Sequence, residues 1–191
     1  LFNGACLSKV PYKKSEEVMN FYEKIGIPVS DLSNAEYSAY AIFFGWMENK
    51  ELTEIEDRYK VYASVLPQVA EELQRLLIVY ERLAQKKGLT IPKEFRDFVD
   101  RVRFGVTEEE LPLKRLRGIG RGSTRKIRIY CNEVLRRPPL NYKGSILDIF
   151  EEMYKKQGET RFTETLQYVK GIGKGKKLKK ILDLVKGRVQ K

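Results

Sequence analysis

A glycine turn of the form apolar-x-Gly-Ile-Gly occurs twice in the second half of the chain, at residues 116–120 and 169–173. Each copy follows a helical pattern that ends in an apolar residue and precedes a cationic helical pattern. Glycine permits the positive φ that such a turn can need, and it leaves the backbone open to a close ligand. The helix that follows begins with backbone N–H groups that lack an intrahelical partner and can hold a phosphate. The repeat therefore predicts two hairpins that bind nucleic-acid phosphates.

The residues expected to contact phosphates are the turn glycines and the cations beside them. In the first copy they are Gly118, Ile119, Gly120, Arg121, Gly122 and Arg125, and in the second Gly171, Gly173, Lys174, Gly175, Lys176 and Lys177. The pattern usually has a small apolar residue four positions after the second glycine, where this chain has Thr124 and Lys177. Lys177 shifts the apolar face of the last helix by one residue. The alternative is that both copies are helix–turn–helix corners that only build the core.

Charge is distributed unevenly along the chain. Residues 1–110 contain 15 Lys/Arg and 19 Asp/Glu, a net charge of −4, whereas residues 111–191 contain 22 and 7, a net charge of +15. A basic segment of this kind favours nucleic acid as the partner, since phosphates attract it regardless of base sequence.

Composition excludes several classes of function. The chain has no histidine, which excludes His-based zinc sites and catalytic triads. Cys6 and Cys131 have neither metal-ligand spacing nor a disulfide pattern, which suits a reducing compartment, and we expect a cytoplasmic protein. No apolar run approaches the roughly 20 residues that span a bilayer. The start lacks the charged region of a signal peptide and an initiator Met, so we expect a fragment of a longer protein.

Apolar periodicity predicts an all-α protein, since no segment alternates with period two. The expected helices cover residues 13–26, 35–49, 53–59, 64–87, 91–104, 107–116, 123–135, 145–157, 161–170 and a last segment with Leu178, Ile181, Leu182 and Val185 on one face. Thr53 with Glu56, and Thr107 with Glu110, have the spacing of capping boxes. Gly105 is expected to end its helix, and the stretch Arg136–Pro139 to break the next one.

The order of motifs along the chain resembles the C-terminal part of archaeal superfamily 2 DNA helicases of the Hjm type. The matching stretches are residues 43–48 (FFGWME), 55–59 (IEDRY), 101–106 (RVRFGV), 109–113 (EELPL) and 116–121 (LRGIGR). Members of this family are ATP-dependent 3′-to-5′ helicases linked to stalled replication forks, repair and recombination. The resemblance covers roughly residues 40–130.

The resemblance implies three segments. Residues 1–35 form an N-terminal helix and connector that would be the end of a winged-helix domain. Residues 36–110 form a ratchet-like helical bundle, and residues 111–191 a basic helix-hairpin-helix domain with two hairpins. The family's long ratchet helix usually presents an Arg and, two turns later, a Trp to the single strand. Gln68 and Arg75 occupy these positions here, so Arg75 is a further candidate DNA contact, to phosphate or by weak stacking. The family's ATPase motifs are absent, so ATP and Mg²⁺ are expected only in the helicase core, and no cofactor in this chain.

Three functions are open at this point. The first is a non-catalytic DNA-binding module of a helicase, which grips single-stranded or forked DNA and contacts the helicase core or repair proteins. The second is a protein-interaction or regulatory module that docks on an acidic partner surface. The third is a hairpin-bearing lyase or nuclease that uses a Lys nucleophile.

Overall fold

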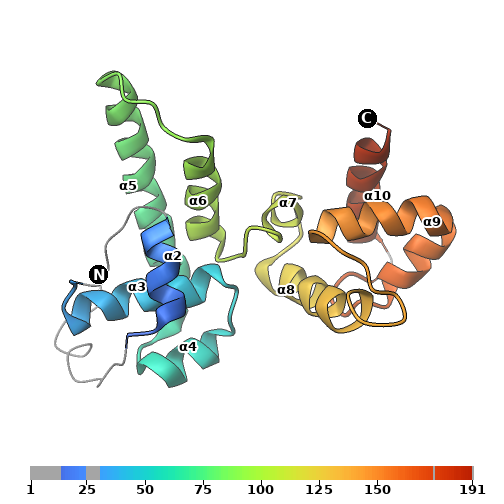
Figure 1. Ribbon diagram of the computed structural model, residues 1–191, viewed down its shortest axis with the longest axis horizontal. Helices are drawn as coiled ribbons and strands as arrows, with labels where there is room; N and C mark the ends of the chain where they lie inside the picture. Colours follow the sequence, from blue (N-terminus) through green and yellow to red (C-terminus); the bar gives the residue numbers. More distant parts are fainter. Residues whose placement is uncertain (1–13, 25–30, 174, 191) are drawn as a thin grey trace. The chain divides into compact units, whose positions relative to one another are not determined.

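The computed structural model describes residues 14–24, 31–173 and 175–190 (Figure 1). The described residues form helices and turns without any strand, which confirms the all-α prediction. The chain divides into two compact units, one ending at Gly105 and the other beginning at Val106. The second unit thus begins five residues before the sequence-based boundary at 110/111.

The first unit is a helical bundle whose core surrounds a buried helix, α3 (Asn34–Met47). Ala41, Ile42, Phe44 and Met47 of α3 are all buried, so this helix is covered on most of its circumference. Tyr22 of α2 packs on it and donates a hydrogen bond to the Tyr40 carbonyl (2.8 Å). The elements are α2 (Glu16–Lys24), α3 (Asn34–Met47), α4 (Leu52–Tyr59), the 3₁₀ turn η1 (Ala63–Val65), α5 (Leu66–Lys86) and α6 (Lys93–Phe104).

Trp46 joins α3 to the end of α6. Its Nε1–H donates to the Val102 carbonyl (2.7 Å) inside the core. Gly105 ends α6 with a φ of +59°, and a Cβ there would lie 2.3 Å from the Trp46 ring. Both the backbone conformation and the close indole therefore require glycine at the predicted stop.

Helix starts differ in part from the sequence-based assignment. The capping box predicted at Thr53 was wrong, because α4 begins after Glu51 without a side-chain cap. Glu56 instead accepts a hydrogen bond from the backbone N–H of Ala63 (2.9 Å) and fixes the turn into η1. A capping box that the sequence analysis missed lies at Ser33 and Glu36, where hydroxyl, carboxylate and backbone N–H groups pair reciprocally. The helix end predicted at Gly26 lies outside the described residues.

The second unit folds around its own core. Its elements are α7 (Leu111–Lys114), α8 (Arg121–Tyr130), the π-helical turn η2 (Cys131–Leu135), α9 (Ile146–Gln167) and α10 (Lys176–Val189). Gly158, with a φ of 73°, interrupts α9 and separates the two helices that the sequence predicts there. Burial raises the pKa of the Cys131 thiol to about 12, so this side chain packs as a small apolar group at neutral pH.

Helix α7 is shorter than predicted, and the acidic residues 108–110 lie before it instead of in its first turn. Residues 108–110 form a turn rather than the first turn of a helix. Only half of the predicted capping box forms: the Glu110 carboxylate accepts from the Thr107 backbone N–H (3.0 Å), while the Thr107 hydroxyl has no partner in the described part of the chain.

Candidate nucleic-acid interface

The first glycine turn, residues 115–120, joins α7 to α8. The backbone N–H of Ile119 donates to the Leu116 carbonyl (3.1 Å), and the Ile119 side chain is buried in the core. Gly118 has a φ of +91°, which favours glycine at this position. Gly120 is the N-cap of α8, and no side chain caps this end of the helix. The apolar residue thus anchors the turn, while the helix N-terminus keeps backbone groups without a side-chain cap.

The second glycine turn, residues 168–175, repeats this geometry 53 positions later. Ile172 N–H donates to the Val169 carbonyl (3.0 Å), Ile172 is buried, and Gly171 has a φ of +100°. Gly175, with a φ of +134°, is the N-cap of α10, again without a side-chain cap. The two turns are therefore built by the same local hydrogen bonds and the same buried isoleucine.

The helices that follow the two turns, α8 and α10, can be superposed in sequence if the second copy has one additional residue before its helix. Leu178 is the counterpart of Thr124, and Lys177 is half-buried beside it. Inward residues of α8 and the start of η2 match those of α10 at a separation of 54 positions: Thr124 and Leu178, Ile127 and Ile181, and Cys131 and Val185. The additional residue lies between Ile172 and Leu178.

The two glycine turns lie side by side. Ser123 Oγ, on α8, donates to the Gly171 carbonyl of the second turn (3.3 Å). Lys177 Nζ donates to the same carbonyl (3.0 Å) and to Ser123 Oγ (3.2 Å). Lys180 Nζ, on α10, donates to the Arg117 carbonyl of the first turn. Each turn is thus tied to the helix that follows the other, and Lys177 bridges the second turn and α8.

The fold requires glycine at position 118, because of its positive φ, but not at positions 120 and 122. Neither Gly120 nor Gly122 has a positive φ, and a Cβ built at either position has no neighbouring atom within 4 Å. The fold would therefore accept alanine at both positions. A glycine that neither the backbone nor the packing requires leaves open space in front of the α8 N-terminus, where a ligand could approach closely.

Several cations around the turns form no ion pair within the described residues. Six carboxylates of the second unit, those of Glu109, Glu110, Asp148, Glu151, Glu152 and Glu159, instead pair with Arg128, Arg136, Lys156, Lys186 and Arg188. The cations of the turns and of the helices after them that have neither an ion pair nor a side-chain hydrogen bond among the described residues are Arg117, Lys126, Lys170, Lys176 and Lys179. Positive charge near the glycine turns is thus left unneutralised by these carboxylates.

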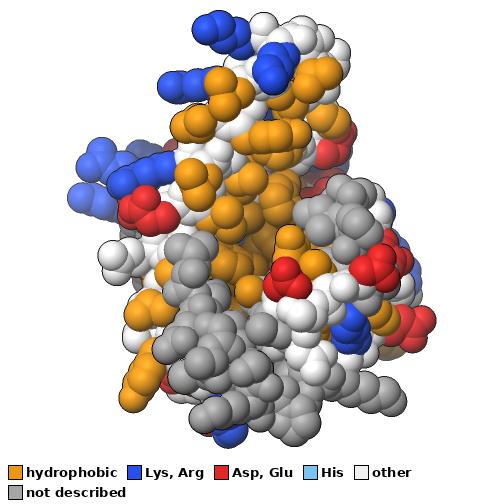
Figure 2. Space-filling view, turned by 90° about the vertical axis from the view of Figure 1, so that its left-hand side faces the viewer, with side chains coloured by type: hydrophobic (Ala, Val, Ile, Leu, Met, Phe, Trp, Pro, Cys, Tyr) orange, Lys and Arg blue, Asp and Glu red, His pale blue; other side chains and the backbone are white. Residues whose placement is uncertain are grey.

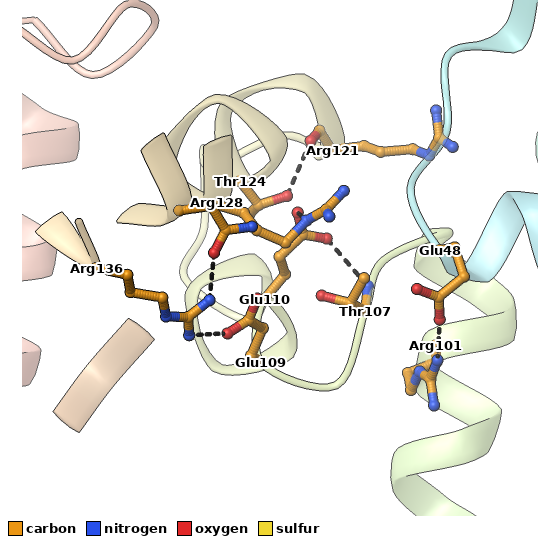
Figure 3. A network of polar contacts seen from close by, with 10 residues as sticks. Glu48, Arg101, Thr107, Glu109, Glu110, Arg121, Thr124, Arg128 and Arg136 are labelled. Carbon is orange, nitrogen blue, oxygen red and sulfur yellow. Dashed lines mark hydrogen bonds and ion pairs between the residues drawn. The ribbon is translucent and has the colours of Figure 1, made fainter. Parts of the chain in front are cut away.

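The acids that precede α7 bind an arginine of α8 and the arginine that follows η2 (Figure 3). Glu110, fully buried, accepts from Arg128 Nε (2.8 Å), and Glu109 accepts from Arg136 (2.6 Å). Arg136 also donates to the Gly144 carbonyl (2.8 Å). These contacts tie the start of the second unit to α8 and η2, which fixes the helix that the first turn introduces.

Tyr168 is the aromatic residue beside a turn that the sequence analysis missed. Its side chain is 83% exposed and lies at the end of α9, three residues before Gly171. Two other tyrosines of the second unit, Tyr142 and Tyr154, are instead packed in the fold: Tyr142 is buried, and Tyr154 lies edge-on against Phe162. Only exposure distinguishes these tyrosines, and the local sequence pattern carried no signal of it.

Two predicted contacts lie apart from this arrangement. Arg75 is on α5 in the first unit, where it pairs with Glu71 (3.3 Å) and Glu72 (3.0 Å). Lys174 lies outside the described residues. The remaining candidates, from Gly118 to Arg125 and from Gly171 to Lys177, belong to the second unit.

No family model, curated protein or solved structure matches the chain. The described residues contain no cluster of three or more His, Cys, Asp or Glu side chains that could hold a metal ion. Among the same residues, no helix has the length and apolar content needed to cross a membrane.

Proposed function

We propose that residues 106–191 form a helix-hairpin-helix domain whose two hairpins bind single-stranded or forked DNA, mainly through phosphates. The observation that carries the proposal is the duplication: two glycine turns with matching hydrogen bonds lie side by side. Each leads into a helix whose N-terminus has no side-chain cap. Backbone N–H groups and the helix dipole favour an anion at such an end. Two adjacent ends could hold two phosphates of one nucleic acid.

Charge supports the same proposal. The second unit contains 22 Lys/Arg and 10 Asp/Glu, a net charge of +12, and Arg117 and Lys170 occupy equivalent positions directly before Gly118 and Gly171. Contacts of this kind add affinity and no base specificity, because every nucleotide presents the same phosphate. Tyr168 adds a ring on which an unpaired base could stack.

The wider proposal is that the chain is the non-catalytic C-terminal module of an ATP-dependent DNA helicase. It rests on the resemblance to the Hjm-type helicases, in which a ratchet-like bundle precedes the hairpin domain. The two-unit division of this chain is compatible with that order. ATP hydrolysis would belong to a motor outside this chain.

A salt titration of DNA binding tests the DNA-binding proposal. If about six phosphates are engaged, the logarithm of the association constant should fall with the logarithm of salt concentration at a slope of about −4 for single strands and −5 for duplex. Lys179→Ala, beyond the second turn, should make the slope shallower by about 0.7–0.9. Lys155→Ala, an exposed lysine on α9, is the matched control and should leave it unchanged.

Absence of binding to single-stranded, forked and duplex DNA would overturn the proposal. So would an affinity that does not depend on salt. Binding to an acidic protein in preference to DNA at about 0.15 M salt, where surface charges are already screened, would instead favour the docking alternative.

A further inference from the structure

Helix α5 presents large apolar side chains to solvent along one side, which we name the α5 face. Its members and their exposed fractions are Leu76 (62%), Val79 (51%), Tyr80 (57%) and Leu83 (56%). Figure 2 shows hydrophobic side chains running along this side of the molecule, with Lys and Arg side chains at its top. Single exposed apolar residues are ordinary, whereas a contiguous group marks an interaction surface.

The α5 face continues a heptad pattern. Val69, Leu73, Leu76, Tyr80 and Leu83 follow one another at alternating steps of four and three residues. This spacing is that of the a and d positions of a coiled coil, which form one seam along a helix. The first two residues of the seam are partly buried against the core of the first unit, and the exposed part begins at Leu76. The exposed seam therefore has the pattern of a helix that packs on another helix.

Charges beside the seam are complementary to those of a reversed copy. Glu72 lies seven residues before Val79, and Lys86 lies seven residues after it, on the same side of the seam. Within one copy Glu72 pairs with Arg75 (3.0 Å), so Lys86 of the second copy would share this carboxylate with Arg75. An antiparallel pair with its two-fold axis near Val79 would place Glu72 of one copy beside Lys86 of the other. In a parallel pair, Glu72 would instead lie beside Leu77 of the other copy, and this ion pair would not form.

We propose that the α5 face pairs antiparallel with the α5 face of a second copy of this chain. The seam supplies the apolar contact, and the Glu72–Lys86 pairs, formed twice by the two-fold axis, fix the direction. Such an interface is isologous, so the same patch serves both copies. The face is small beside the roughly 1,200–2,000 Å² of stable interfaces, so the dimer should form at micromolar or higher concentration. The proposal is independent of DNA binding.

Sedimentation equilibrium of the full chain without nucleic acid, from about 1 μM to about 1 mM, tests the proposal. A concentration-dependent dimer is expected. Leu76→Glu and Leu83→Glu should weaken it at least tenfold, and circular dichroism should stay unchanged because both side chains are already exposed. Gln85→Glu is the matched control: it adds the same charge to the same helix, away from the face, and should leave the dimer intact.

Charge reversal tests the direction of the pair. Lys86→Glu should weaken the dimer by placing two glutamates together, and Glu72→Lys combined with Lys86→Glu should restore it. Failure of the double variant to recover would refute the antiparallel register. A chain that stays monomeric to about 1 mM would overturn the proposal.

Discussion

Replacing Gly122 by alanine separates a structural role of the first glycine turn from a binding role. Gly122 is the second residue of α8, has no positive φ, and a Cβ built there has no atom within 4 Å. Alanine loses less conformational freedom than glycine when a helix forms, so the free energy of unfolding should rise by up to about 1 kcal/mol. For a unit of this size, the Tm should rise by up to about 8 °C.

The same methyl group should weaken DNA binding. It would occupy the open space before the α8 N-terminus, where we propose that a phosphate sits. Loss of one hydrogen bond to a charged group costs about 1.5–3 kcal/mol. This corresponds to a roughly 10- to 150-fold lower affinity. Fluorescence anisotropy with labelled single-stranded and forked oligonucleotides at fixed salt measures the affinity, and differential scanning calorimetry measures the Tm.

Two further glycines serve as controls for the alanine substitution. Gly187→Ala, near the end of α10, has equally open surroundings and no positive φ, so it should add similar stability and leave affinity unchanged. Gly118→Ala should instead lower stability by about 1–2 kcal/mol, because its φ of +91° is unfavourable for alanine. A Gly122→Ala protein that is at least as stable as the parent and binds DNA equally well would refute the close approach of a phosphate to this helix end.

Three other substitutions test separate parts of the second unit. Glu110→Gln should lower its free energy of unfolding by about 3 kcal/mol in urea titrations, because the half-buried Arg128 guanidinium would lose its buried carboxylate. Hydrogen bonds from the hydroxyl and backbone N–H of Ser145 lower the pKa of the Asp148 carboxyl. The ionised carboxylate therefore contributes its full stabilisation above the ordinary pKa near 4. This stabilisation is lost as the pH falls through the lower pKa that Asp148 has in the folded protein. Ser145→Ala should therefore cost about 1 kcal/mol at pH 7 and flatten the acid dependence of the Tm below about pH 4. Tyr168→Ala should weaken single-strand binding by roughly 5- to 150-fold while Tyr168→Phe retains it, and an equal loss on blunt duplex DNA would argue against stacking.

Local patterns determined most of the secondary structure. The apolar spacing of residues 64–87 predicted the long helix seen as α5, and Gly105 and Gly158 end or interrupt helices because their positive φ values are available to glycine. These features depend on interactions within a few residues of the chain. Periodicity and turn residues are therefore sufficient to predict them.

The partners of polar side chains could not be read from the sequence. Glu110 was predicted only as the capping-box partner of Thr107, yet it also accepts a hydrogen bond from Arg128, 18 residues away. Lys177 looked like a phosphate contact, yet its amino group bridges Ser123 and the Gly171 carbonyl. A charged side chain takes the nearest complementary group in space, and that group is known only after the helices have packed.

The sequence by itself determined that this chain is all-helical, that its basic charge lies in the last 81 residues, and that a glycine turn is repeated 53 positions apart. Only the tertiary structure decided that the two turns lie side by side, that Tyr168 is exposed while Tyr142 is buried, and that the described residues leave the α5 face exposed. The reason is physical: helix formation is governed by neighbours along the chain, whereas burial and contact depend on which faces of distant helices meet.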